Sequence, residues 1–129
     1  MTGSSGSRKI KEIAVCNDKK ENDKIVIASR VKVADTFFKR FIGLMGTARM
    51  DKGSALLIYP CRQVHTFFMF TSIDIIFLDR ENKLLHLIES MPPFRISPYI
   101  KESYKVLELP PQTITKFNIT GMDRIKLQS

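Results

Sequence analysis

Cys61 and His65 are the residues of this sequence whose chemistry most directly suggests a reactive site. A cysteine beside a histidine can act with it as nucleophile and base, or both can be ligands of a metal. Residues four positions apart in an extended strand lie ~13 Å apart, so these side chains can meet only if the chain turns between them. Otherwise, His65 is more simply a histidine that bonds to a backbone carbonyl at a sheet edge.

Two acidic residues interrupt apolar segments, Asp74 in SIDIIFLD and Glu108 in VLELP. A carboxylate that enters a core needs a cation or backbone donors. For Asp74, the cation could come from Arg40, Arg62 or Arg95. The simpler interpretation is that Asp74 orients a loop or a cap and that Glu108 faces an edge. The two acids could also serve as acid and base, if the fold brings them together.

The sequence contains no complete metal or cofactor motif. The only other histidine, His86, lies in the apolar segment KLLHLIE, and no CxxC or HxxxH spacing occurs. Methionine thioethers bind Cu(I), but the methionines lie on different predicted elements, which favours core packing. GLMG lacks the spacing of a phosphate-binding loop and suits a helix end. We therefore expect no cofactor.

The first part of the chain predicts a β-hairpin followed by one helix. IKEIAVC and KIVIASRVKV are β-branched runs separated by the polar segment NDKKEND, as in two strands joined by a solvated turn. Apolar residues then recur at helical spacing from Phe38 to Met45. With Asp35 placed to cap its start and GLMG to end it, this pattern predicts one short amphipathic helix near Asp35 to Met45.

The rest of the chain predicts short strands bounded by Gly, Pro, Asp, Asn or Ser. These strands are SALLIYP, VHTFFMF, IDIIFLD, KLLHLIE, YKVLELP, TKFNI and DRIKLQ. DREN forms a hairpin turn, and the proline-rich MPPFRISPY forms a long loop. Alternation places His65, Phe67 and Met69 on one side of a central strand. The pattern predicts a mainly β fold, either a compact β-sandwich of jelly-roll type or an open barrel, with one helix.

Composition limits the domain organisation and the classes of partner. The chain has 129 residues, 43% of them hydrophobic, and suits a single β domain over 9–129 after a flexible leader or cloning remnant at 1–8. Its formal charge of +8 favours anionic partners, but the basic residues are dispersed, so specific nucleic-acid binding is not expected. The sequence has no transmembrane segment and no secretory signal, which predicts a cytoplasmic protein. We expect both cysteines to be thiols.

Several segments together resemble a widespread prokaryotic family, domain of unknown function 192. They are VADTFFKRFIGLMG, PCRQVHTFFM, IDIIFLD, PFRISP, VLELP and GMDRI, from about Arg30 to Ile125. The resemblance implies a compact β-sandwich of jelly-roll type with one helix, and it brings no established activity. The recurrent residues that it points to are Arg40, Gly43, Leu44, Met45, Cys61, His65, Phe67, Met69, Asp74 and Glu108. Phe70 stands where relatives often have a basic residue, and Gln112 where a glycine is common.

Two functions of different classes fit these residues. The first is a noncatalytic binding module for a small polar or anionic ligand, a glycan or a peptide end. Its expected ligand-binding residues are Arg40, Met45, Cys61, His65, Phe67, Met69 and Asp74. The second is a hydrolase in which Cys61 or a metal-bound water attacks, with His65 as base. We favour binding, because no triad, metal set or phosphate loop completes an enzyme.

Overall fold

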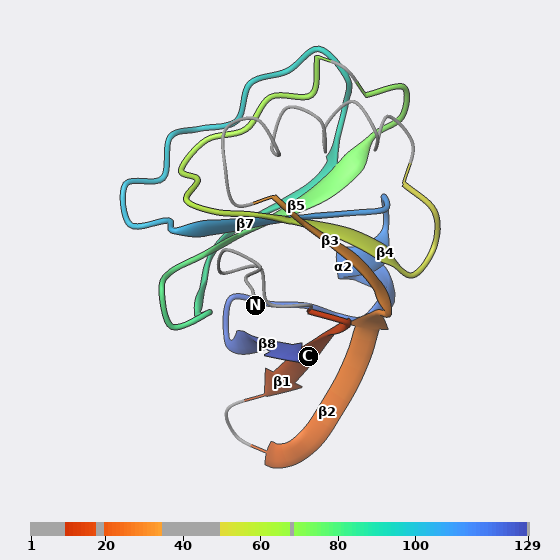
Figure 1. Cartoon of the computed structure of the whole chain (residues 1–129), viewed down its shortest axis with the longest axis vertical. Helices are drawn as coiled ribbons and strands as arrows, with labels where there is room; N and C mark the ends of the chain where they lie inside the picture. Colours follow the sequence, from red (N-terminus) through yellow and green to blue (C-terminus); the bar gives the residue numbers. More distant parts are fainter. Residues whose placement is uncertain (1–9, 18–19, 35–49, 68, 129) are drawn as a thin grey trace, which may run out of the picture.

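The protein consists mainly of two β-sheets (Figure 1). The computed structural model describes residues 10–17, 20–34, 50–67 and 69–128, with the backbone alone described at 16–17 and 20–23. One sheet has the order β2-β1-β8 and contains β1 (Glu12–Asn17), β2 (Lys20–Ala28) and β8 (Asp123–Gln128). The other has the order β3-β4-β7-β5-β6 and contains β3 (Arg30–Ala34), β4 (Ser54–Ile58), β5 (Ile73–Leu78), β6 (Leu84–Met91) and β7 (Lys105–Leu109). The described residues also include a short helix, α2 (Thr113–Lys116).

The predicted N-terminal hairpin is confirmed, but its second run of residues divides between the two sheets. β1 pairs antiparallel with β2, and the strand is interrupted at Ser29. The backbone N–H groups of Ser29 and Arg30 both donate to the carbonyl of Gly53, at 2.9 and 3.1 Å. Beyond this corner, β3 joins the five-stranded sheet and runs parallel to β4. One continuous stretch of backbone therefore belongs to both sheets.

Two apolar clusters cover the two faces of the five-stranded sheet. The inter-sheet cluster consists of Ile13, Val15, Ile27, Ala28, Ala55, Leu57, Ile76, Leu78, Leu84, Leu107, Leu109, Ile114, Ile119 and Ile125. The outer cluster consists of Ala34, Leu56, Ile58, Cys61, Val64, Met69, Ile73, Ile75, Phe77, Met91 and Val106. Successive side chains of a strand point to opposite faces, so a strand with both faces covered is wholly buried. All six residues of β5 are buried, which makes this sheet a middle layer.

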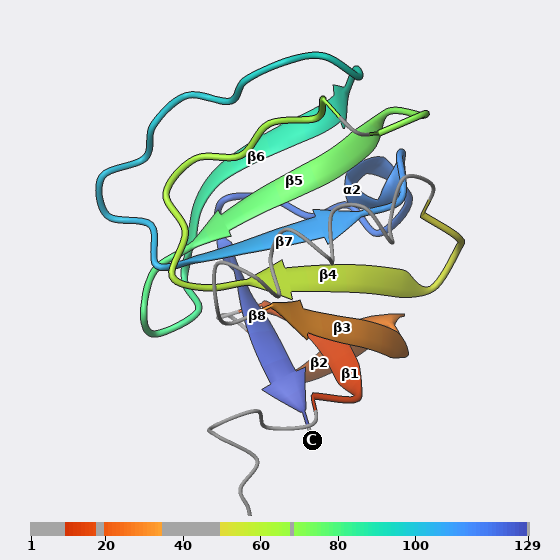
Figure 2. The same ribbon diagram turned by 45° about the horizontal axis from the view of Figure 1, so that its top comes forward.

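Two long loops, residues 59–72 (all but 68 described) and 92–104, form a third layer on the outer cluster, here called the loop layer (Figure 2). Thr66 is fully buried and joins the two loops. Its backbone N–H donates to the carbonyl of Arg95 at 2.9 Å, and its hydroxyl donates to the carbonyl of Pro92 at 2.6 Å. Its own carbonyl accepts from the N–H of Phe94 at 3.1 Å. The prediction of a long loop at MPPFRISPY is confirmed, and the loop is fixed to its neighbour by hydrogen bonds.

Two of the predicted strands are wrong. VHTFFMF belongs to the loop layer, where the N–H of Met69 donates to the carbonyl of Thr66 at 3.2 Å and closes a turn. Because of this turn, Met69 is buried while Phe67 is 43% exposed, so the two residues do not share one side. TKFNI contains the end of α2 and the turn after it. Val64 and Met69 of the first segment and Ile119 of the second pack in the apolar clusters without joining a sheet, which alternation alone does not distinguish from a strand. The helix predicted near Asp35 to Met45 lies outside the described residues.

The predicted mainly β fold of sandwich type is confirmed. Within the described residues, the strand orders of both sheets are open, so neither closes into a barrel. The β5–β6 hairpin is also confirmed, and its turn is held by Asp79, whose Oδ1 accepts from the N–H groups of Glu81 and Lys83, both at 2.9 Å. Among the described residues, no helix is long and apolar enough to cross a membrane.

Candidate functional site

Cys61 and His65 both lie in the loop layer, with different surroundings. Cys61 is 4% exposed and belongs to the outer cluster. It carries a thiol, not a disulfide, and the thiol donates to the carbonyl of Gln63 at 3.2 Å. His65 is partly buried, and its ring stacks on that of Phe67 with the centroids 4.9 Å apart. A nucleophilic thiol needs access to its substrate, so the burial of Cys61 favours a packing role.

Asp74 binds backbone donors from two other elements. Its side chain is fully buried on β5, where Oδ1 accepts from the N–H of Ser90 at 2.8 Å and Oδ2 from the N–H of Ile114 at 2.8 Å. Ser90 has a left-handed backbone (φ 50°) at an irregularity in the β5–β6 pairing, and Ile114 lies in α2. Asp74 therefore fixes a bulge and a helix to the sheet, in agreement with the simpler interpretation of this residue.

Glu108 is the buried acid whose carboxylate has the fewest partners. It is fully buried on β7, between Leu56 of β4 and Ile75 of β5. Neither of its carboxylate oxygens has a hydrogen-bond partner among the described residues. Burial raises the pKa of Glu108 from 4.5 to about 8, because desolvation disfavours the charged form. Glu108 is thus a neutral acid over most of the physiological pH range, and the expectation that it faces an edge is wrong.

The two buried acids and Cys61 do not meet at one place. Asp74 pairs with Leu109 and faces the inter-sheet cluster, whereas Glu108 faces the outer cluster, so the sheet separates the two carboxylates. Cys61 is aligned with the start of β7, because its N–H donates to the carbonyl of Tyr104 at 2.9 Å. Four residues of extended strand, ~13 Å, separate that point from Glu108. The structure thus assembles no acid–base pair from these residues. Arg40 and Met45 lie outside the described residues.

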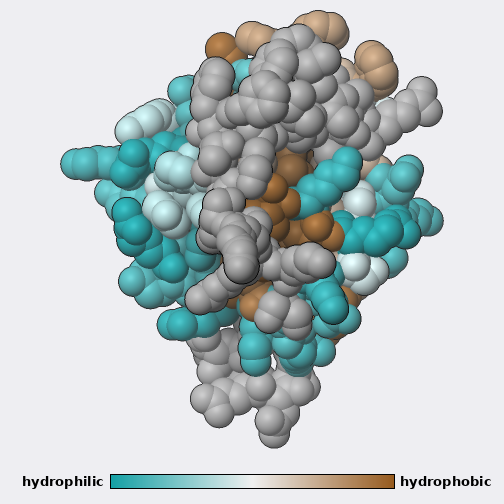
Figure 3. All heavy atoms as spheres, in the orientation of Figure 1, coloured by the Kyte–Doolittle hydropathy of each residue, from teal (hydrophilic) through white to brown (hydrophobic). Residues whose placement is uncertain are grey.

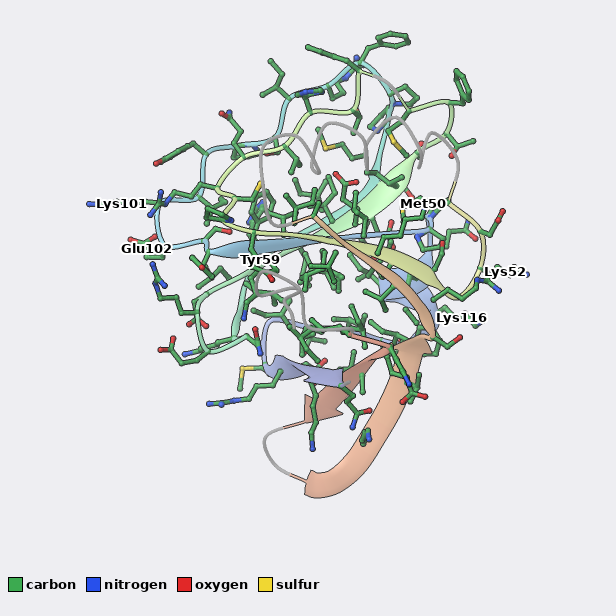
Figure 4. The ribbon with its side chains drawn as sticks, viewed as in Figure 1. Met50, Lys52, Tyr59, Lys101, Glu102 and Lys116 are labelled. Atoms are coloured by element: carbon green, nitrogen blue, oxygen red, sulfur yellow. The ribbon has the colours of Figure 1, made fainter. Side chains whose placement is uncertain are left out.

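A groove at the corner between the sheets was missed by the sequence analysis. It has a volume of about 470 Å³ and is lined by Val26, Ile27, Ala28, Ser29, Lys52, Gly53, Pro110, Pro111, Gln112, Thr113, Lys116 and Phe117. This lining contains two lysines and no acidic residue. Lys52 and Lys116 lie on the same side of the molecule, opposite Lys101 (Figure 4). One sequence signal did point here, since Gln112, at the position where the family resemblance implies a glycine, has a left-handed backbone (φ 70°).

Neither the groove nor the loop layer contains an evident metal site. The described residues include no group of three or more His, Cys, Asp or Glu side chains arranged to hold a metal ion. The groove lining offers hydroxyl, amide and ammonium groups beside apolar surface. Such a lining is suited to organic anions, because lysine ammonium groups attract negative charge and donate hydrogen bonds.

Comparison with known proteins assigns a family. The sequence pattern of the family described as DUF192, uncharacterized ACR, matches residues 17–127. The chain belongs to the DUF192 family. A UPF0127 protein of Thermococcus sibiricus is 43% identical over 72 residues, which cover 52% of this DUF192 chain and 46% of that relative. A UPF0127 protein of Pyrococcus abyssi is 34% identical over 96 residues, which cover 70% of the chain and 79% of the relative.

Two crystal structures resemble this DUF192 protein in fold. A protein of unknown function from Novosphingobium aromaticivorans superposes with a TM-score of 0.74 at 16% identity, covering 98% of this chain and 91% of that one. A protein from Sinorhizobium meliloti superposes with a TM-score of 0.74 at 17% identity, covering 95% and 98%. At these identities the likeness concerns the fold alone.

Replacing Asp74 should destabilise the protein strongly. In Asp74→Ala, the N–H groups of Ser90 and Ile114 lose their acceptors, and each buried donor left without a partner costs about 1–3 kcal/mol. We expect the free energy of unfolding in urea to fall by about 2–5 kcal/mol, and by less in Asp74→Asn, which keeps one acceptor oxygen. The exposed Asp51→Ala is the control. Equal losses in Asp74→Ala and Asp51→Ala would show that these hydrogen bonds contribute nothing.

Glu108 should make stability depend on pH. The Glu108 carboxyl group ionises above pH 4.5 in the unfolded chain and only near pH 8 in the folded chain. Its contribution to the free energy of unfolding is therefore fully present below pH 4.5 and is lost as the pH rises toward 8. The loss is about 1.4 kcal/mol per pH unit within that window. Glu108→Gln cannot ionise, so its stability relative to the parent protein should rise between pH 5 and pH 8.

The measurement for Glu108 is urea unfolding at several pH values, with the exposed Glu102→Gln as control. Taking the difference between variant and parent removes the contribution of all other titrating groups. Stability curves for Glu108→Gln and the parent that run parallel across this range would contradict a raised pKa of the buried acid.

Cys61 should react slowly with iodoacetamide in the folded protein. Its thiol is 4% exposed, and buried cysteines are inert. In a Cys16→Ser background, which leaves a single thiol, we expect modification at least about tenfold slower in buffer than in urea. Mass spectrometry over a time course measures both rates. Rapid modification in buffer would support the cysteine-dependent hydrolase.

Proposed function

We propose that this DUF192 protein is a noncatalytic binding module whose groove takes a small carboxylate with an apolar body, such as the carboxyl end of a peptide. The observation that carries the proposal is the groove itself, whose lining combines two lysines with apolar residues. Ligand sites are typically concave, mostly apolar and about 300–1,000 Å³ in volume, with a few polar groups that fix orientation. The groove agrees with this description in volume and in lining.

The positive charge of the groove favours a negatively charged ligand. Lys52 and Lys116 are exposed, and no acidic side chain of the lining opposes them. The Nζ of Lys116 lies 5.2 Å from the centre of the Phe117 ring, so charge and apolar surface adjoin. A ligand with a carboxylate next to a hydrocarbon group would satisfy both. A purely polar anion would leave the surface of Val26 and Phe117 in contact with water.

The strand beside the groove favours a peptide. β2 is an edge strand of the described sheet, with β1 as its one described neighbour. Val26, Ile27 and Ala28 are its last three residues, and all three line the groove. An extended peptide can add to such an edge through backbone hydrogen bonds, which is a common way of recognising peptide ends.

The same contacts weigh against the alternative hydrolase. Cys61 is buried, its thiol donates to a backbone carbonyl, and the two buried acids lie on opposite faces of the sheet. Cleavage requires a nucleophile and a base that reach the same substrate atom. Binding requires none of these groups, so the groove supports a binding module better than an enzyme.

The proposal is tested with a pool of acetylated pentapeptides, randomised at the last two positions and carrying either a free carboxylate or a carboxamide. We expect the carboxylate pool to shift the backbone amide NMR signals of residues 26–29 and 112–117, and the carboxamide pool to bind more weakly. Lys52→Gln and Lys116→Gln should each weaken binding about two- to fivefold, as expected for exposed ion pairs. Lys101→Gln, on the opposite side of the molecule, is the matched control (Figure 4).

Two results would contradict the proposal. One is the absence of any shift around the groove with the carboxylate pool. The other is binding that Lys101→Gln weakens as much as Lys52→Gln and Lys116→Gln, because this would indicate general attraction to a protein of charge +8.

A further inference from the structure

Exposed apolar side chains gather on the loop layer. Eight large apolar residues are exposed in the described part of the chain, and five of them, Phe67, Phe70, Phe94, Ile96 and Tyr99, lie in the two loops. Hydrophobic side chains project at the upper end of the molecule in Figure 3, where these loops lie in Figure 1. Phe70 and Phe94 are 73% and 70% exposed, so each ring projects into solvent and not onto its neighbours.

The backbone around Phe94 is fixed in a conformation that a phenylalanine rarely adopts. Phe94 has φ 62°, in the left-handed region, which is uncommon for a bulky residue and costs free energy. Its N–H donates to the carbonyl of Thr66, and the next N–H, of Arg95, donates to the hydroxyl of Thr66 at 3.0 Å. A strained backbone that presents an exposed aromatic ring is a feature associated with functional sites.

The charge of the loop layer indicates the kind of partner. Its two loops carry three cations and one acidic residue, Glu102; Arg62 and Lys101 lie together at one side, where Arg62 donates to the carbonyl of Lys101 at 3.0 Å, and Arg95 is the cation beside the exposed rings. Arg95 lies between Phe94 and Ile96 in sequence and is itself exposed. Apolar side chains next to basic ones are the combination by which peripheral proteins bind anionic membranes, where rings enter the interface and cations attract lipid headgroups.

We propose that the loop-tip surface, formed by Phe67, Phe70, Phe94, Arg95 and Ile96, docks reversibly on an anionic lipid bilayer. The rings of Phe70 and Phe94 project into solvent, and a fluid bilayer can accept them without a matching set of pockets. A protein partner would need a complementary cavity for each ring. The surface is made of different residues from the groove, so this proposal does not depend on the proposed function.

A tryptophan reporter tests the contact directly, because the chain contains no tryptophan. Phe94→Trp places the reporter on the loop-tip surface, and Met122→Trp places it at an equally exposed position, 68%, in the turn before β8. With phosphatidylcholine vesicles that contain phosphatidylglycerol, we expect a blue shift of emission for Phe94→Trp and none for Met122→Trp. Pure phosphatidylcholine vesicles should give a smaller shift, and added salt should weaken the response.

Vesicle sedimentation measures the contribution of the ring. Phe94→Asn removes it and keeps a residue that tolerates the left-handed backbone, so the variant should remain folded. We expect its partition onto phosphatidylglycerol-containing vesicles to fall about tenfold, and that of Met122→Asn to stay unchanged. Thermal unfolding of each variant checks that the fold persists.

Three outcomes would overturn the proposal. The first is no blue shift of Phe94→Trp with anionic vesicles, and the second is an equal shift of Met122→Trp, which would indicate unspecific adsorption. The third is a shift of Phe94→Trp that depends on protein concentration without vesicles. That result would assign the loop tips to self-association and not to a membrane.

Discussion

Coverage of the five-stranded sheet on both faces is the constraint on which the other features of this structure depend. Because the three-stranded sheet packs on one face and the loop layer on the other, every side chain of β5 is removed from water. A polar side chain in this middle layer must find partners within the protein or lose its charge. Asp74 uses the first solution through two backbone N–H groups, and Glu108 uses the second by remaining protonated.

These two acids also mark how far the sequence can be interpreted. Both were recognisable as single acids in apolar strands, and the hairpin turn at Asp79 was predicted correctly. Alternation along β5 and β7 could not assign them to opposite faces, because that depends on which strands pair and in what register. The segment VHTFFMF has the composition of a strand, yet the turn at Thr66 places it over the sheet. The groove could not be predicted, since its lining comes from three segments that are far apart in the sequence.

The surfaces with a potential for binding lie on different layers. The groove adjoins the corner where the two sheets meet, and the loop-tip surface lies on the third layer, over the outer cluster. Both combine apolar side chains with basic ones, in a chain whose formal charge is +8. The buried middle layer fixes the backbone from which both surfaces project.

The proposed ligand site adjoins the corner at Ser29, so ligand binding there would be coupled to folding. The groove is lined by the end of β2, by the Lys52–Gly53 turn before β4 and by the segment that ends in α2, so its occupant would touch residues of both layers. The binding site for such a ligand exists only while the two sheets are packed against each other. The binding free energy of the ligand would add to the cohesion of the sandwich, increasing with ligand concentration as linkage requires. A bound ligand would then stabilise the packing of the two sheets, which the continuous backbone through Ser29 already connects.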